Sequence, residues 1–209
     1  MSWQEITEAI ILNEYYVTKE GEEITLECLI KNESSNIKLY WLKDAINVNL
    51  YLTNKYSHGT LNQPSLTIKN IETSDAGNYT CKLANLYGLS EDVVVLTVLF
   101  VQVAPPLHLS PNANESVFLP CEASGGNRVI WRRNGEEITT TGSLEYSGGT
   151  VIKPSLTISN VTRYHAGNYT CDTSYGSVTA TSDTQLQLSV KGTEIFRHTI
   201  NCIKGIFST

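Results

Sequence analysis

The sequence predicts an all-β protein made of two tandem β-sandwiches joined by a short, stiff linker. Three observations predict this. A segment of 27 residues occurs twice in the chain of 209, at 55–81 and at 145–171, with 16 identical positions. Apolar and polar residues alternate through both copies, as in half-buried strands, and no stretch of ten residues has a helical period. Each copy also has its own cysteine pair and tryptophan. The repeat therefore marks two copies of one unit.

The strands follow in chain order from this alternation, because residues two apart lie on the same face of a strand. In the first unit, the residues expected to face the core are Ile24, Leu26, Cys28, Ile37, Leu39, Trp41, Leu96 and Val98. In the second unit, they are Val117, Leu119, Cys121, Val129, Trp131, Leu186, Leu188 and Val190. Asn134-Gly135 predicts a two-residue hairpin, since both residues tolerate a positive φ.

The repeat and the composition also predict where the domains begin and end. We expect an N-terminal extension at 1–9, a first domain at 10–100, a linker at 101–106, a second domain at 107–190 and a tail at 191–209. The linker ends in two prolines and contains no glycine. Such a segment is a stiff spacer rather than a flexible tether. We therefore expect an extended rod with limited bending.

Charge and composition exclude several functions. The net charge is −6, with seven lysines against 13 acidic residues and no arginine in 1–100. A nucleic-acid-binding protein would need a basic surface instead. No apolar run approaches the ~18 residues that cross a bilayer, so we expect no transmembrane segment in this chain. The four histidines have no metal-ligand spacing, and no nucleophile or phosphate-binding motif occurs. We therefore expect no enzymatic activity, no metal and no small-molecule cofactor.

The five cysteines indicate an oxidising compartment. Four form two pairs that are 53 and 50 residues apart, at 28, 81, 121 and 171, and no CxxC occurs. This spacing excludes the usual zinc-ribbon and thioredoxin-like sites. It is typical of disulfides that close long loops, which persist outside the reducing cytosol. Cys202 lies in the tail, where it either bridges to another chain or has no role.

The order Cys…Trp…Leu-x-Ile…Asp-x-Gly-x-Tyr-x-Cys resembles the immunoglobulin (Ig) domain of the intermediate, or I-set, type. The resemblance covers about 10–100 and 103–190. In the first unit it is carried by Cys28, Trp41, Leu66, Ile68, Asp75, Gly77, Tyr79 and Cys81, followed by Asn85 and Gly88. In the second unit it is carried by Cys121, Trp131, Leu156, Ile158, Gly167, Tyr169 and Cys171. His165 replaces the acid that Asp75 supplies, which leaves a charge-assisted contact at that corner open.

The resemblance implies the core of each domain and a function. It implies the disulfides Cys28–Cys81 and Cys121–Cys171, with Trp41 and Trp131 packed against them. It also implies that Tyr79 and Tyr169 face inward and bond back to the preceding corner. The sequence is similar to multi-Ig invertebrate adhesion and matrix proteins of the hemicentin kind. We therefore expect a non-enzymatic recognition or adhesion module whose partner is a protein, either a second copy or a different one.

Four aromatic residues are the candidates for contact with that partner. Tyr87 and Tyr175 are expected at hairpin tips, and Tyr40 is expected on the outer face of the third strand. Phe118 is expected to point outward beside Pro120. Tyrosine suits such positions because one end of its side chain is apolar and the other is polar.

The compartment is expected to be the cell surface or the extracellular space. Five N-x-[ST] sequons are candidates for glycosylation, at Asn32, Asn78, Asn114, Asn160 and Asn168. The first residues lack the basic start and apolar core of a signal peptide, so we expect a piece of a longer protein. Two alternatives stay open: a cytosolic structural module of a titin-like filament, and the ectodomain of a receptor kinase or phosphatase.

Overall fold

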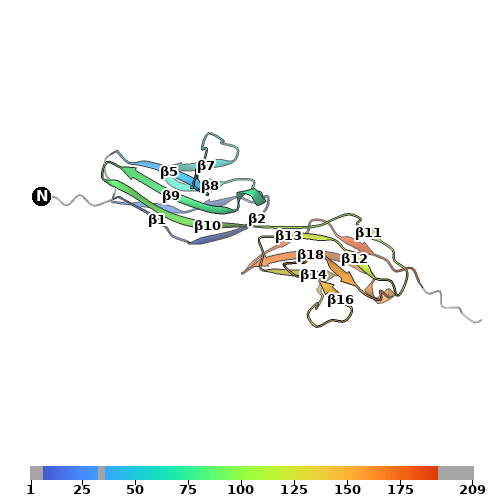
Figure 1. Ribbon diagram of the computed structural model, residues 1–209. Helices are drawn as coiled ribbons and strands as arrows, with labels where there is room; N and C mark the ends of the chain where they lie inside the picture. The colour runs from blue at the N-terminus through green and yellow to red at the C-terminus, as the bar shows by residue number, and fades with distance from the viewer. Residues whose placement is uncertain (1–6, 33–35, 193–209) are drawn as a thin grey trace, which may run out of the picture.

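The computed structural model describes residues 7–32 and 36–192, which form two β-sandwich domains placed end to end (Figure 1). The elements of domain 1 are β1 (Glu8–Ile11), β2 (Tyr15–Lys19), β3 (Ile24–Leu26), β4 (Cys28–Lys31), β5 (Lys38–Lys43), β6 (Ile46–Asn47), β7 (Tyr56–Thr60), β8 (Gln63–Ile68), the 3-10 turn η1 (Thr73–Asp75), β9 (Gly77–Asn85) and β10 (Gly88–Val103). The elements of domain 2 are β11 (His108–Leu109), β12 (Val117–Leu119), β13 (Cys121–Ser124), β14 (Arg128–Arg133), β15 (Glu136–Glu137), β16 (Tyr146–Gly148), β17 (Leu156–Ile158), η2 (Arg163–His165), β18 (Gly167–Tyr175), β19 (Val178–Thr181) and β20 (Leu186–Leu188).

Both domains have the same two-layer arrangement. In domain 1 one layer runs β10-β9-β5-β6, with β2 parallel to β10, and the other layer is β3-β8-β7. The short pair β1-β4 completes the sandwich. In domain 2 the corresponding layers are β11-β20-β18-β14-β15, with β19 paired to β18, and β12-β17-β16. The expected all-β fold of two tandem sandwiches is confirmed.

Each domain has its own core, as the separate cysteine pairs indicated. In domain 1 the fully buried side chains include Leu26, Trp41, Leu66, Ile68, Ile71, Tyr79, Leu83 and Leu96. In domain 2 they include Leu119, Trp131, Leu156, Ile158, Val161, Tyr169, Leu186 and Leu188. Except for Ile71 and Val161, which follow β8 and β17, these residues come from alternate strand positions, since alternate side chains of a strand share a face.

Strand β10 belongs to both domains. Its first part pairs with β9 and β2 of domain 1, and residues 100–103 pair with β13 of domain 2. Val98 is buried in the core of domain 1, whereas Leu99 is buried in the core of domain 2. Residues 101–103, which the sequence assigned to a linker, are thus part of a sheet. Strand β10 ends at Val103, shortly before Pro105, which has no N–H to donate to a sheet.

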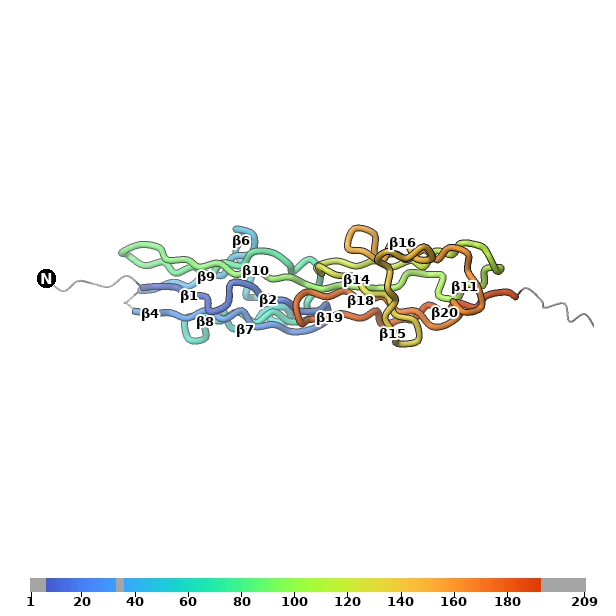
Figure 2. Tube along the Cα trace, turned by 90° about the horizontal axis from the view of Figure 1, so that it is seen from below, coloured from blue at the N-terminus to red at the C-terminus, as the bar shows by residue number. Residues whose placement is uncertain are grey.

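The junction is further closed by contacts on either side of β10. Strand β19 of domain 2 lies against β2 of domain 1 (Figure 2), and Val17 packs against the core of domain 2. In the turn before β14, Gly125 has a φ of +76° and lies directly on β10, where an added Cβ would be 2.0 Å from the carbonyl oxygen of Val98. Only glycine fits this approach.

The two ends of the chain differ in how much the structure describes. Strand β1 starts at Glu8, and Ala9 is buried, so these residues of the expected extension are part of domain 1. Of the expected tail 191–209, residues 193–209 lie outside the described residues, and Cys202 is among them. No helix of the described part of the chain is long and apolar enough to cross a membrane.

Candidate protein-interaction surface

The two disulfides and the two tryptophans form the centre of each sandwich. Cys28 is bonded to Cys81 and Cys121 to Cys171, with Cα–Cα distances of 6.4 and 6.5 Å. The indole N–H of Trp41 donates to the carbonyl oxygen of Pro64 at 2.8 Å. The indole N–H of Trp131 donates to Pro154 at the same distance. The buried tryptophans therefore have partners for their one polar atom.

The two buried tyrosines close the corner that precedes strand β9 or β18. The hydroxyl of Tyr79 donates to the carbonyl oxygen of Asp75 at 2.9 Å, and that of Tyr169 donates to His165 at 2.6 Å. Desolvation by burial raises the pKa of Tyr169 to about 12, and it raises the pKa of Tyr79 as well. Both hydroxyls stay protonated and serve as structural donors.

The corner of domain 2 is held by a different pair of side chains from the corner of domain 1. In domain 1, Asp75 accepts the backbone N–H of Glu72 at 2.7 Å and pairs with Lys55. In domain 2, Nδ1 of His165 accepts the backbone N–H of Thr162 at 3.0 Å, and Nε2 lies 3.5 Å from Glu145. A histidine stands where domain 1 has its acid, and an acid stands where domain 1 has its lysine.

The two other histidines within the described residues, His58 and His108, have hydrogen-bond partners on neighbouring strands. Nδ1 of His58 lies 3.2 Å from the Thr67 hydroxyl, and Nδ1 of His108 lies 3.0 Å from the Gln187 side-chain oxygen. Within 7–32 and 36–192, no three His, Cys, Asp or Glu side chains are grouped as a metal site requires.

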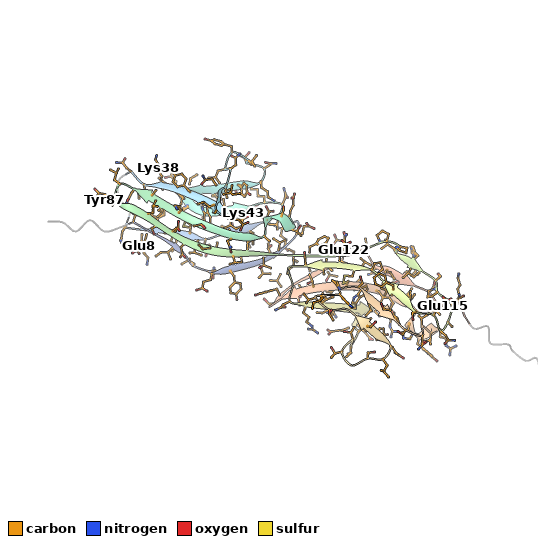
Figure 3. The ribbon with its side chains drawn as sticks, in the orientation of Figure 1. Glu8, Lys38, Lys43, Tyr87, Glu115 and Glu122 are labelled. Atoms are coloured by element: carbon orange, nitrogen blue, oxygen red, sulfur yellow. A yellow bond between two sulfur atoms is a disulfide. The ribbon has the colours of Figure 1, made fainter. Side chains whose placement is uncertain are left out.

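The four aromatic candidates do not form one site. Tyr40 lies on the outer face of β5, and Tyr87 lies in the turn between β9 and β10 at the far end of domain 1 (Figure 3). Phe118 is exposed on β12, in the opposite layer of domain 2. Tyr175 ends β18, in the hairpin that faces the junction with domain 1. Only Tyr40 and Tyr87 belong to the same sheet, Tyr40 on its outer face and Tyr87 in a turn at its end.

The outer face of the sheet around Tyr40 has more exposed apolar residues than the sequence predicted. The outer face of domain 1 also carries Leu89, Val93 and Val95 on β10 and Tyr15 on β2, and we call these four residues with Tyr40 the apolar face. Their exposed fractions range from 40% to 65%. A hollow of about 400 Å³ lies beside Tyr40 and is lined in part by Ala84 and Leu86. The run Val93-Val94-Val95-Leu96 could have predicted exposed apolar residues here, because apolar residues at consecutive strand positions place apolar side chains on both faces of a sheet.

Three rows that cross β5, β9 and β10 make up most of the face, and a fourth row sets Val95 between Asn78 and Tyr15. Tyr40, Lys82 and Glu91 are neighbours in the central row, by the register of β5, β9 and β10. Nζ of Lys82 lies 2.8 Å from Glu91 Oε2. In the adjacent rows, Leu89 lies beside Ala84 and Val93 beside Thr80. One ion pair therefore lies between the rows that carry Leu89 and Val93, and these rows also contain Lys38 and Thr80.

Domain 2 lacks this face, although it repeats the same strands. The residues 90 positions after Tyr40 and Lys82 are Ile130 and Asp172, and both are buried. Asp172 is held by Nε of Arg132 at 2.7 Å. Thr179 and Thr181 occupy the places that Leu89 and Glu91 hold in domain 1. The apolar face is thus a property of domain 1 and not of the fold.

All five sequon asparagines are exposed. They are Asn32, Asn78, Asn114, Asn160 and Asn168. Asn78 points from the same side of the sheet as the apolar face, since it is paired with Val95. Glycosylation of the five sites stays a prediction.

Comparison with protein families assigns the fold to a family. The model of the immunoglobulin domain matches residues 8–85 and 101–174, which is more than half of the chain. The chain belongs to the immunoglobulin domain family. Its two sandwiches are therefore Ig domains.

Curated relatives share this Ig domain sequence over much of the chain. Mouse hemicentin-2 is 30% identical over 162 residues, which are 74% of this chain and 3% of the relative. Human contactin-6 is 33% identical over 134 residues, which are 59% of this chain and 13% of the relative. The hemicentin, contactin and turtle relatives are multi-Ig adhesion proteins. This chain spans only a small part of their length.

Solved structures share the fold. The titin fragment I67–I69 aligns with a TM-score of 0.51 and 22% identity, over 87% of this chain and 65% of that one. A Dscam structure aligns with a TM-score of 0.52 and 20% identity, over 88% of this chain and 46% of that one. These Ig proteins share the arrangement of strands with this chain.

Proposed function

We propose that this chain is a non-enzymatic recognition module of an extracellular multi-Ig adhesion protein, and that its protein partner binds the apolar face of domain 1. The observation that supports this proposal is the exposure of Tyr15, Tyr40, Leu89, Val93 and Val95 on one sheet surface. The relatives add support, because the hemicentin, contactin and turtle proteins are multi-Ig adhesion proteins.

The physical reason is that exposed apolar area favours association. Removing apolar surface from water yields roughly 25 cal/mol per Å². Soluble monomers seldom expose contiguous apolar patches larger than a few hundred Å², and larger patches mark binding sites. Domain 2 folds with threonines and an ion pair at the matching positions, so the fold itself does not require the apolar side chains.

The test compares matched substitutions in the two domains. Beads coated with the chain are applied to cultured cells and to beads that carry the same chain. We expect Leu89→Asp to reduce bead binding about tenfold or more, because it places a charge among apolar contacts. Thr179→Asp changes the equivalent position of domain 2 and should leave binding unchanged. Equal binding by both variants, with unchanged thermal unfolding, contradicts a partner on this face.

A second candidate is a structural spacer, which the shared strand β10 favours. A strand common to two domains restricts bending, as a spacer in a rod or filament requires. In that case neither Leu89→Asp nor Thr179→Asp affects binding, and no bead binding occurs with the unsubstituted chain either. The two disulfides support a spacer outside the cytosol, because cytosolic thiols are kept reduced.

A further inference from the structure

We propose that the partner of the apolar face is a second copy of this chain, packed face to face and pointing in the same direction, with Lys82 of each copy opposite Glu91 of the other. This inference rests on the proposed function, because it names the partner of the same face.

The first step is the difference between the two central strands. In three successive rows the outward side chains of β9 are Thr80, Lys82 and Ala84, which are small or positively charged, and Asn78 faces outward in the next row, beside Val95. The outward side chains of the facing part of β10 are Leu89, Glu91 and Val93, which are large and apolar or negatively charged. The register sets these residues side by side in three rows. One strand is thus the complement of its neighbour in both size and charge.

The second step is the symmetry of a dimer. Two copies of one surface bind each other around a twofold axis that lies in the interface. An axis along the strands, between β9 and β10, places β9 of one copy over β10 of the other. Lys82 then faces Glu91, Ala84 faces Leu89, and Thr80 faces Val93. Large side chains meet small ones, as close packing requires.

The third step decides the direction of the two chains. An axis across the strands at the central row would reverse one copy, and it would place Lys82 opposite Lys82 and Glu91 opposite Glu91. Like charges that face each other in an interface are unfavourable. The axis along the strands avoids this and leaves both copies pointing in the same direction.

The ion pair within each copy supports the same arrangement. The Lys82 and Glu91 side chains are partly exposed, at 29% and 54%, so the pair contributes little to the stability of a single copy. In the dimer the two pairs form a group of four charges surrounded by the apolar face. The domain 2 residues that match Lys82 and Glu91 are Asp172 and Thr181. Asp172 is already buried against Arg132 and is not available to a second copy.

Specific interfaces bury roughly 1,200–2,000 Å² in total, and this face offers only five exposed apolar side chains and one ion pair per copy. We therefore expect a weak dimer, which is measured by sedimentation from about 1 µM to about 1 mM. The protein is used with its N-glycans trimmed to a single sugar, because Asn78 lies on the same side of the sheet.

The decisive experiment exchanges charges between copies. Lys82→Glu makes the central row acidic, and Glu91→Lys makes it basic. We expect each variant alone to dimerise at least about tenfold more weakly than the unsubstituted chain, and a 1:1 mixture of the two to dimerise again. Thr181→Lys in domain 2 is the control and should dimerise like the unsubstituted chain. A mixture that stays monomeric overturns the proposal.

A second measurement tests the direction. Glu115 lies at the far end of domain 2 (Figure 3), so a spin label at Glu115→Cys, in a Cys202→Ser background, reports where the two domain 2 copies lie. Same-direction packing places the two labels close together, and reversed packing places them at opposite ends of the dimer. Long label distances overturn the same-direction arrangement.

Cell binding that depends on Leu89 without any dimer overturns the second copy as partner and leaves the proposed function standing.

Discussion

His165 occupies the corner of domain 2 where domain 1 has Asp75, and its ring reproduces the contact that the carboxylate makes. Nδ1 accepts a backbone N–H, as the Asp75 oxygen does, and Nε2 is directed at Glu145, which takes the place of Lys55. The contacts of this corner could not be predicted from the sequence. In the structure the partner of His165 is Glu145, an acid that lies 90 positions after Lys55.

The exchanged pair leads to a test by double substitution. His165→Asp alone should destabilise domain 2 by about 1–2 kcal/mol, because a buried carboxylate then faces Glu145. Glu145→Lys added to it recreates the pair of domain 1 and should restore most of that loss. Urea unfolding of the single and double variants measures the coupling. If the two effects simply add, the two side chains do not interact.

At the scale of elements, β10 and the turn that contains Gly125 join the domains. The strand carries Val98 into one core and Leu99 into the other, and the Gly125 backbone lies on the Val98 carbonyl. Because successive side chains of a strand point to opposite faces, one extended segment serves both cores. The direction of domain 2 therefore depends on this strand and this turn together.

Gly125→Ala tests the junction. The added Cβ cannot stay 2.0 Å from the Val98 oxygen, so we expect the turn to move away and the angle between the domains to vary more widely. Gly135→Ala is the control, since Gly135 has a similar φ of +86° but no atom within 4 Å of an added Cβ. Both should cost about 1 kcal/mol of stability for the left-handed backbone. Solution X-ray scattering should show a broader distribution for Gly125→Ala only; equal scattering from both variants contradicts a tight junction.

At the scale of the whole molecule, two disulfides and five exposed sequons support the proposed extracellular compartment. Each disulfide closes a loop of about 50 residues and contributes roughly 4 kcal/mol in the chain-entropy description. Both would be lost under the reducing conditions of the cytosol. The adhesion relatives are extracellular or cell-surface proteins, which supports the same compartment.

The compartment is tested by intact mass. The native protein is alkylated without reduction, and its mass is measured before and after removal of N-glycans. We expect one alkylated cysteine, Cys202, because the other four are paired. We also expect a loss of mass when the glycans are removed. Five alkylated cysteines and no change of mass would place the chain in the cytosol and favour the titin-like alternative.

Much of the fold could be predicted from the sequence, because it depends on local pattern and on repetition. The repeat at an offset of 90 showed two units, and the alternation around Cys28 and Trp41 showed which side chains face the core. The end of domain 1 was harder to predict. A strand that continues into the next domain has the same local alternation as one that ends, so Val101 was assigned to a linker.

The binding surface could be predicted only in part. Tyr40 and Tyr87 were named as candidates, because an aromatic residue at an outward strand position or in a turn can be recognised from the local sequence. Leu89 and Val93 were missed, since their exposure depends on what covers the sheet. Phe118 and Tyr175, the other two candidates, lie on surfaces of domain 2.

The sequence by itself determined the fold class, the number of domains and the residues of each core, because side-chain alternation and a repeated segment are local properties. Only the tertiary structure decided which polar and apolar side chains of different strands become neighbours. Lys82 and Glu91 lie nine positions apart and meet because β9 and β10 pair in one register. That pairing, rather than either residue alone, gives domain 1 a surface complementary to itself.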